Sequence, residues 1–169
     1  MLLQPGSFVH LPGRPVPLVS IMTQVGKPRG QGRITFASGD PRARPHIESA
    51  ILDDPIDLDR AVSALQLGRE LVEESAMRKL ARPFWPPEPV FRSPAAMRRW
   101  IRYSCDSGYH PAGTVPMGKA VDSRGRVFGV ENLIVADASI MPTIPSSNLN
   151  LPTLMLGERF GEWLAAGEI

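Results

Sequence analysis

Proline and glycine constrain this chain more than any other feature, because its 169 residues include 18 prolines and 15 glycines. Proline lacks a backbone donor and interrupts the interiors of helices and central strands. We therefore expect irregular connections and short, capped elements. Prolines also interrupt the first residues, which show no charged-then-apolar pattern, so no signal sequence is expected there.

The bulk composition indicates a globular chain. Hydrophobic residues make up 43% and charged residues 21% of the sequence. A net charge of +2 argues against nucleic-acid binding, and no apolar run approaches the ~18 residues of a membrane span. The single cysteine, Cys105, fits a reducing compartment, so we expect a cytoplasmic location.

The strand patterns predict antiparallel pairing within an α+β fold. Residues 18–25 are apolar and β-branched, and residues 33–37 alternate in polarity, so we expect these two runs to pair across a turn at 26–32. Residues 1–17 are expected to be a loop with one strand at 7–11. A second hairpin is expected at 121–127.

Three stretches predict helices. The first opens at Asp54 or Asp57 and continues to about residue 80, carrying an apolar stripe at helical spacing. The second covers 95–104 and is capped by Ser93. The third is expected to begin at Pro152, with Asn150 as its cap.

The last third of the chain holds the candidate site. Residues 133–136 form a short apolar run that predicts a buried strand, and this run ends abruptly on Asp137. Acidic residues at the ends of buried strands are common at ligand sites in α/β folds. Because the pattern turns helical after Asn150, we expect His110, Asp137 and Asn148 to converge at one strand-to-helix passage.

A series of linked motifs resembles the glucose–methanol–choline (GMC) flavoprotein oxidoreductases, in the order and spacing of that family's C-terminal portion. They are His110, Pro111, Gly113, Thr114, Met117 and Gly118, then Val121 and Asp122, then residues 135–139 with Pro142, and finally Asn148 and residues 157–159. The resemblance covers roughly 32–164, and several linked motifs are far more specific than one short pattern.

The resemblance implies FAD-dependent oxidation of a small-molecule alcohol, with hydride transfer from a CH–OH group to the flavin N5. His110 takes the place of the family's active-site histidine, the base for the substrate hydroxyl. Asn148 falls where the family has a second His or Asn that hydrogen-bonds the same oxygen. An imidazole near neutrality suits this proton transfer.

The resemblance also implies cofactor contacts. Asp137 and Ala138 match the turn near the ribityl and pyrophosphate groups. Asn150, Pro152 and Thr153 match the start of the helix that faces the flavin pyrimidine. We therefore expect free backbone N–H groups at Thr153 and its neighbours, opening to a cavity, where they would favour an anionic flavin.

One expected motif is absent. Flavoproteins of this family carry a Gly-x-Gly-x-x-Gly turn near the N-terminus, and this sequence has none. We therefore interpret it as a C-terminal portion that needs the N-terminal FAD-binding portion as partner and is inactive alone. Residues 1–104 would complete a substrate-binding domain with an antiparallel sheet and covering helices. Residues 105–169 would return to the FAD-binding domain with one strand and one helix.

Other interpretations remain open at this level. The chain could be a non-catalytic remnant that acts only as a binding module. A hydrolase using Ser139 or Ser107 with His110 lacks the expected Gly-x-Ser-x-Gly elbow. Asn148 could serve as a turn or N-cap residue, and Asp137 could simply cap a turn. No metal site is predicted from three scattered histidines.

Overall fold

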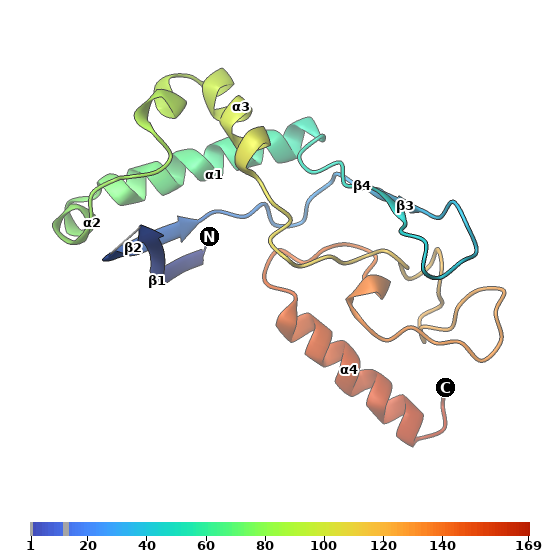
Figure 1. Cartoon of the computed structure of the whole chain (residues 1–169). Coiled ribbons are helices and arrows are strands. Elements are labelled where there is room, and N and C mark those ends of the chain that lie inside the picture. Colours follow the sequence, from blue (N-terminus) through green and yellow to red (C-terminus); the bar gives the residue numbers. More distant parts are fainter. Residues whose placement is uncertain (1, 12–13) are drawn as a thin grey trace. The chain divides into compact units, whose positions relative to one another are not determined.

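The computed structural model describes residues 2–11 and 14–169, and the chain divides into two compact units (Figure 1). Unit 1 consists of Met1–Val25 and Ala50–Cys105, and unit 2 consists of Gly26–Ser49 and Asp106–Ile169. Both units combine short antiparallel sheets with helices, so the predicted α+β class is confirmed. The chain passes from unit 1 to unit 2 after Cys105, and the segment 26–49 belongs to the same unit as the C-terminal part of the chain.

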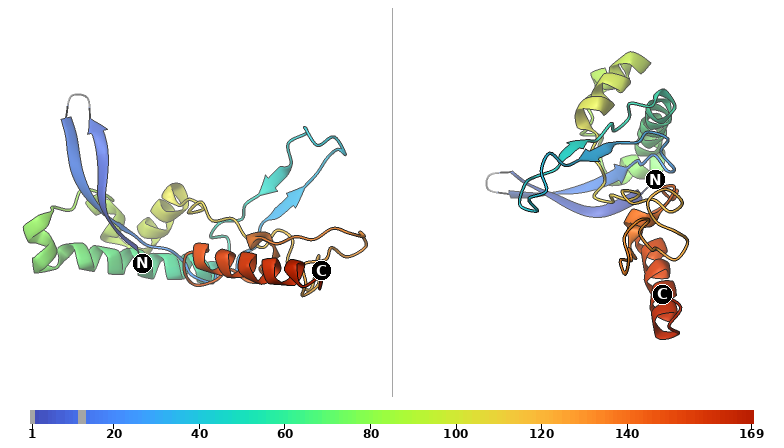
Figure 2. Two further views of the ribbon diagram at one scale, coloured as in Figure 1. Left: turned by 90° about the horizontal axis from the view of Figure 1, so that it is seen from below. Right: turned by 90° about the vertical axis from the view of Figure 1, so that its right-hand side faces the viewer.

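Unit 1 begins with a two-stranded antiparallel ribbon, which Figure 2 shows clearly. β1 (Leu2–Leu11) pairs with β2 (Arg14–Met22). The predicted pairing of 18–25 with 33–37 is therefore wrong, and so is the loop expected over most of 1–17. The segment after β2 passes into unit 2, where the Lys27 N–H donates to the Pro145 carbonyl at 3.5 Å.

The helices of unit 1 are α1 (Pro55–Glu73), α2 (Ser75–Leu80), the 3₁₀ helix η1 (Glu88–Arg92) and α3 (Pro94–Ser104). Of these, α1 and α3 begin where the sequence predicts, whereas the start of α2 and the 3₁₀ helix η1 are not predicted. The Asp54 carboxylate caps α1 by accepting from two backbone N–H groups of its first turn, and the Ser93 hydroxyl accepts from Ala96. The single predicted helix to residue 80 is divided at Glu74, whose backbone is extended.

The core of unit 1 lies where α3 and η1 pack on α1, as Figures 1 and 2 show. Its buried side chains are Leu58, Val62, Val90, Met97 and Ile101. The first two come from the apolar stripe of α1, and the last two lie four residues apart on one face of α3. The predicted helical periodicity therefore identifies the faces that pack.

Unit 2 consists mainly of turns, with one long helix. β3 (Arg33–Thr35) pairs with β4 (His46–Glu48) so that Ile34 opposes Ile47, while α4 (Asn150–Ala165) packs near the short 3₁₀ helix η2 (Ala138–Ile140). Buried Val121, Ile140 and Phe160 form the core. The predicted hairpin at 121–127 is present as a single antiparallel bridge between Val121 and Val127.

Two predicted elements of unit 2 differ from the structure. Residues 133–136 form no strand: Ile134 makes one bridge, to Arg126, and is half-buried. Within the described chain this run has a neighbour on one side only, so no ladder extends from it. Helix α4 begins at Asn150 and not at Pro152, because the Thr153 N–H already donates to the Leu149 carbonyl. Asn150 is therefore not the cap.

Within the described part of the chain, every helix is too short or too polar to cross a membrane.

Candidate active site

His110 leaves a tightly constrained turn in unit 2. Gly108 and Tyr109, which precede it, both have positive φ angles, and the Tyr109 N–H donates to the Ser107 hydroxyl at 3.2 Å. Pro111 follows and fixes the backbone on the other side. The imidazole is exposed. A rigid backbone on both sides therefore presents an accessible side chain.

Backbone hydrogen bonds join the His110 segment to the segment after Asp137. The N–H groups of Gly113, Val115 and Met117 donate to three consecutive carbonyls, those of residues 138–140, at 3.1, 2.9 and 2.9 Å. The donors lie at every second residue of the first segment, and the acceptors lie at successive residues of the second. The pattern resembles a short β-ladder, although the second segment is a 3₁₀ turn. This ladder brings the two motif regions together, as the sequence predicts.

Asn148 is held at the start of α4. The neighbouring Leu149 is buried, and the Asn148 Oδ1 accepts from the Asn150 N–H at 2.8 Å. Such a bond from an Asn side chain to the backbone two residues on is a local turn motif. The turn role that the sequence left open for Asn148 is therefore present in the structure.

The side chains of His110 and Asn148 are in contact. The Asn148 Nδ2 lies 3.0 Å from the His110 Nε2, between residues 38 positions apart. Because the Asn148 Oδ1 faces a backbone N–H, its other amide end must be the NH₂ group, which can only donate. The tautomer that fits this contact carries its ring proton on Nδ1, so that the His110 Nε2 accepts from the Asn148 NH₂ group. This arrangement leaves a basic nitrogen beside an amide donor.

Asp137 organises the turn that follows it. Its Oδ1 accepts from both the backbone N–H and the hydroxyl of Ser139, at 2.7 and 2.5 Å, and so caps η2. The Ser139 hydroxyl, and then the Ser139 backbone N–H, lower the pKa of Asp137, while slight burial opposes them. The carboxylate is therefore an ionised turn cap.

Free backbone donors mark the region where the resemblance implies a cofactor. The expected free N–H at Thr153 is wrong, since it donates to the Leu149 carbonyl at 2.9 Å, and Pro152 has none. Among the described residues, the N–H groups of Ala138 and Leu151 donate no hydrogen bond. These two donors, one at the start of α4, fit the oxygen-rich groups of a flavin nucleotide.

The side chains of the predicted site residues do not all contact one another. His110 and Asn148 meet directly, whereas the Asp137 side chain bonds Ser139. Sequence reasoning missed Ser139 as the partner of Asp137, and it missed the Asn150 N–H that orients Asn148. The Asn-x-Asn spacing was the available signal, because Asn side chains often bond the N–H two residues on.

An exposed imidazole thus lies in contact with a side-chain amide close to the start of α4. The comparisons identify the family: this chain belongs to the GMC oxidoreductases. The C-terminal family model, described as "GMC oxidoreductase", matches residues 28–157.

Two relatives illustrate the similarity. The chain is 36% identical to 5-(hydroxymethyl)furfural oxidase from Methylovorus sp. (strain MP688), over 92% of this chain and 33% of that protein. It is 37% identical to oxygen-dependent choline dehydrogenase 1 from Chromohalobacter salexigens, over 78% of this chain and 25% of that protein. The chain therefore spans a quarter to a third of the length of these relatives.

Solved structures give the same result. An FAD-dependent oxidoreductase from Chaetomium thermophilum matches with a TM-score of 0.77 and 25% identity, over 85% of this chain and 26% of that chain. Pyridoxine 4-oxidase from Mesorbium loti matches with a TM-score of 0.74 and 29% identity, over 81% of this chain and 28% of that chain.

Proposed function

We propose that this chain supplies the proton-transfer residues of an FAD-dependent alcohol oxidoreductase. The contact between His110 and Asn148 carries the proposal, because it pairs a neutral imidazole acceptor with a fixed amide donor. The family membership supports it, as do relatives whose names describe an alcohol dehydrogenase, a choline dehydrogenase and an oxidase. The substrate class is a small alcohol with a CH–OH group.

Oxidation of an alcohol requires the loss of a proton from oxygen and a hydride from carbon. His110 Nε2 takes the hydroxyl proton, and the Asn148 NH₂ donates to the same oxygen and steadies its developing negative charge. Because the amide is neutral, it does not compete for the proton. A positioned base of this kind contributes about 10²–10⁴-fold to a rate.

The direct contact between His110 and Asn148 must open when substrate binds. The hydroxyl would donate to His110 Nε2 and accept from Asn148 Nδ2, and so replace one 3.0 Å contact with two hydrogen bonds through the substrate oxygen. Both side chains are exposed, so this rearrangement needs no core movement. The Asn150 N–H keeps the amide facing the correct way throughout.

FAD, when bound, supplies the hydride acceptor. In this chain the backbone N–H groups of Ala138 and Leu151 would hold it, the second at the positive end of α4. Asp137 keeps the Ala138 turn in shape through its bonds to Ser139. Of the other predicted cofactor residues, Asn150 and Pro152 shape the helix start, and Thr153 lies one residue further on.

The test is a chimaera in which this chain replaces the matching third of 5-(hydroxymethyl)furfural oxidase. With 5-(hydroxymethyl)furfural as substrate, stopped-flow absorbance should record flavin reduction. The His110→Ala variant should lower that rate by about 10²–10⁴-fold, because the base is lost. FAD content, measured by the absorbance of the released flavin, should not change.

His46→Ala is the matched control, since His46 is an exposed histidine of the same unit that lies in β4 and bonds Glu48. It should leave flavin reduction unchanged. Equal rates for His110→Ala and the parent chimaera would contradict the proposal. An FAD-loaded chimaera that fails to oxidise any alcohol would favour the alternative of a non-catalytic binding module.

A further inference from the structure

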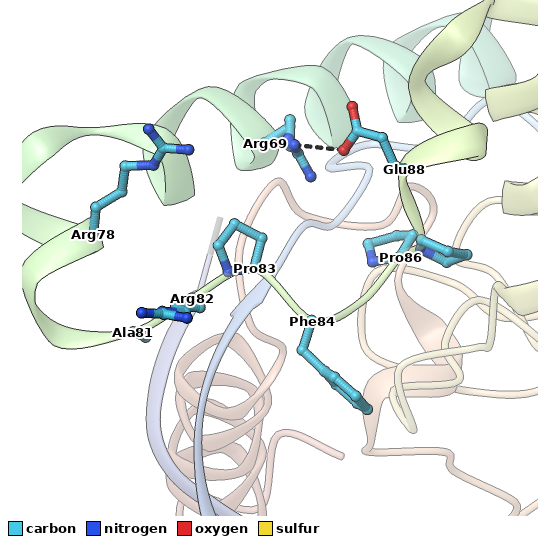
Figure 3. Close-up of a pocket in the computed structure, with 9 residues that line it drawn as sticks. Arg69, Arg78, Ala81, Arg82, Pro83, Phe84, Pro86 and Glu88 are labelled. Carbon is cyan, nitrogen blue, oxygen red and sulfur yellow. Dashed lines mark hydrogen bonds and ion pairs between the residues drawn. The ribbon is translucent and has the colours of Figure 1, made fainter.

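A cavity of about 480 Å³ lies in unit 1, outside the candidate active site. Figure 3 shows it between α1, α2 and the segment that leads to η1. The residues that line it are Arg69, Arg78, Ala81, Arg82, Pro83, Phe84, Pro86, Pro87 and Glu88. Its volume falls within the roughly 300–1,000 Å³ range of small-molecule sites.

The three arginines of this cavity are not equivalent. Arg69 is fully engaged: its Nε lies 2.5 Å from Glu73, its Nη2 lies 2.7 Å from Glu88, and its guanidinium stacks 4.9 Å from the Phe91 ring. Its side chain is only 20% exposed. Arg69 and Glu88 therefore form a neutral, ordered wall, drawn as the dashed pair in Figure 3.

Arg78 and Arg82 supply the unbalanced charge. Neither forms an ion pair with any residue of the described chain. In Figure 3 the Arg78 guanidinium points from α2 toward the Arg69 side of the cavity. Because Glu88 is already bonded to Arg69, the lining carries two positive charges that no lining carboxylate offsets.

The rest of the wall is rigid and apolar. Pro83, Pro86 and Pro87 have fixed φ angles and no N–H groups, so they offer flat hydrocarbon faces. Phe84 adds an aromatic ring that is 76% exposed. A planar apolar group can lie against such a surface without disturbing any backbone hydrogen bond.

We propose that this cavity binds a small aromatic carboxylate. Its carboxylate pairs with the guanidinium group of Arg78, whose planar fork matches that geometry, and Arg82 adds a second positive charge to the lining. Its ring lies against the prolines and Phe84. The inference is independent of the proposed oxidoreductase function, since no residue of the cavity belongs to the candidate active site.

The experiment titrates the full chain with benzoate and follows backbone ¹H–¹⁵N resonances. Those of Arg78, Arg82, Phe84 and Glu88 should shift with saturation, whereas that of His110 should not. Benzamide, a neutral ligand of the same shape, should bind at least tenfold more weakly, because it cannot form charge-assisted hydrogen bonds. Raising the salt concentration should weaken the binding of benzoate.

Single substitutions then test which positive charges contribute to benzoate binding. Arg78→Gln should weaken benzoate binding by about tenfold or more, through the loss of one charged hydrogen bond, and Arg82→Gln should weaken it less, through the loss of a nearby charge. Lys79→Gln is the matched control, since it removes one charge from the same helix without changing the lining. Absence of saturable shifts, equal binding of benzamide, or equal effects of all three variants would overturn the proposal.

Discussion

Asn148 forms hydrogen bonds with both ends of its amide, and this determines the chemistry of its neighbour. Its oxygen accepts from the backbone of α4, and its nitrogen contacts the His110 Nε2. An Asn in a free rotamer could present either end to the imidazole. Here the Asn150 N–H occupies the amide oxygen, so the NH₂ end of Asn148 faces the His110 imidazole.

This arrangement predicts the tautomer of His110. In ¹⁵N NMR of the imidazole at alkaline pH, where the ring is neutral, we expect the Nδ1–H form with an unprotonated Nε2. Asn148→Asp replaces the donor with an acceptor, so the Nε2 should then carry a proton. A wild-type spectrum dominated by the Nε2–H tautomer would be incompatible with the assigned hydrogen bond.

At the scale of elements, turns rather than helices hold the site. His110 follows a turn with two positive φ angles, and Asp137 caps a three-residue 3₁₀ helix. A further turn at 122–125 lies in the same unit. Its Gly125 N–H donates to the Asp122 carbonyl, and Gly125 packs against the Phe160 ring. Steric fit at this glycine therefore links the turn to α4.

Two alanine substitutions test that fit. Gly125 and Gly129 both have positive φ angles, of 72° and 76°. A Cβ at Gly125 would collide with the Val135 carbonyl oxygen and lie 2.6 Å from the Phe160 ring, whereas one at Gly129 would meet nothing within 4 Å. Gly129→Ala should therefore cost only the left-handed backbone strain of about 1–2 kcal/mol. Gly125→Ala should cost about 1–3 kcal/mol more through overpacking.

Urea denaturation of both variants measures the difference in the free energy of unfolding. Equal losses for Gly125→Ala and Gly129→Ala would mean that the turn does not pack tightly against the Val135 backbone and the Phe160 ring.

The sequence predicts the helices of this protein better than its strands. Capping residues such as Asp54 and Ser93 act within one turn, so local patterns identify α1 and α3. Strand pairing depends on which partner a run selects: residues 18–22 pair with β1 and residues 33–35 pair with β4, whereas the sequence pattern predicts that the two runs pair with each other. His110 and Asn148 were predictable from linked motifs, whereas the bonds of Ser139 and Thr153 required the backbone geometry.

At the scale of the whole molecule, α4 is apolar on more than one side. Phe160 is buried in unit 2, while Leu151, Leu154 and Met155 near the start of the helix are mostly exposed. A helix that is hydrophobic around its circumference is typical of the interior of a larger structure. The proposed activity accordingly requires the further length of polypeptide that the relatives have, since this chain spans a quarter to a third of them.

We therefore expect this polypeptide by itself to bind FAD poorly. Its sequence has no Gly-x-Gly-x-x-Gly turn to hold the pyrophosphate. After purification with excess FAD and desalting, its visible spectrum should show no stoichiometric flavin, whereas the chimaera with 5-(hydroxymethyl)furfural oxidase should be yellow. A stoichiometric flavin spectrum from this polypeptide alone would contradict the expectation.

The central claim is that His110 and Asn148 act on one substrate oxygen, and a double-mutant cycle in the chimaera tests it most directly. Asn148→Ala alone should slow flavin reduction by about 10–150-fold, the equivalent of a charged hydrogen bond of about 1.5–3 kcal/mol. Residues that act as a unit are strongly non-additive, so the double variant should be about as slow as His110→Ala. A double variant slowed by the full product of the two single effects would show that the residues act independently, and the account would be wrong.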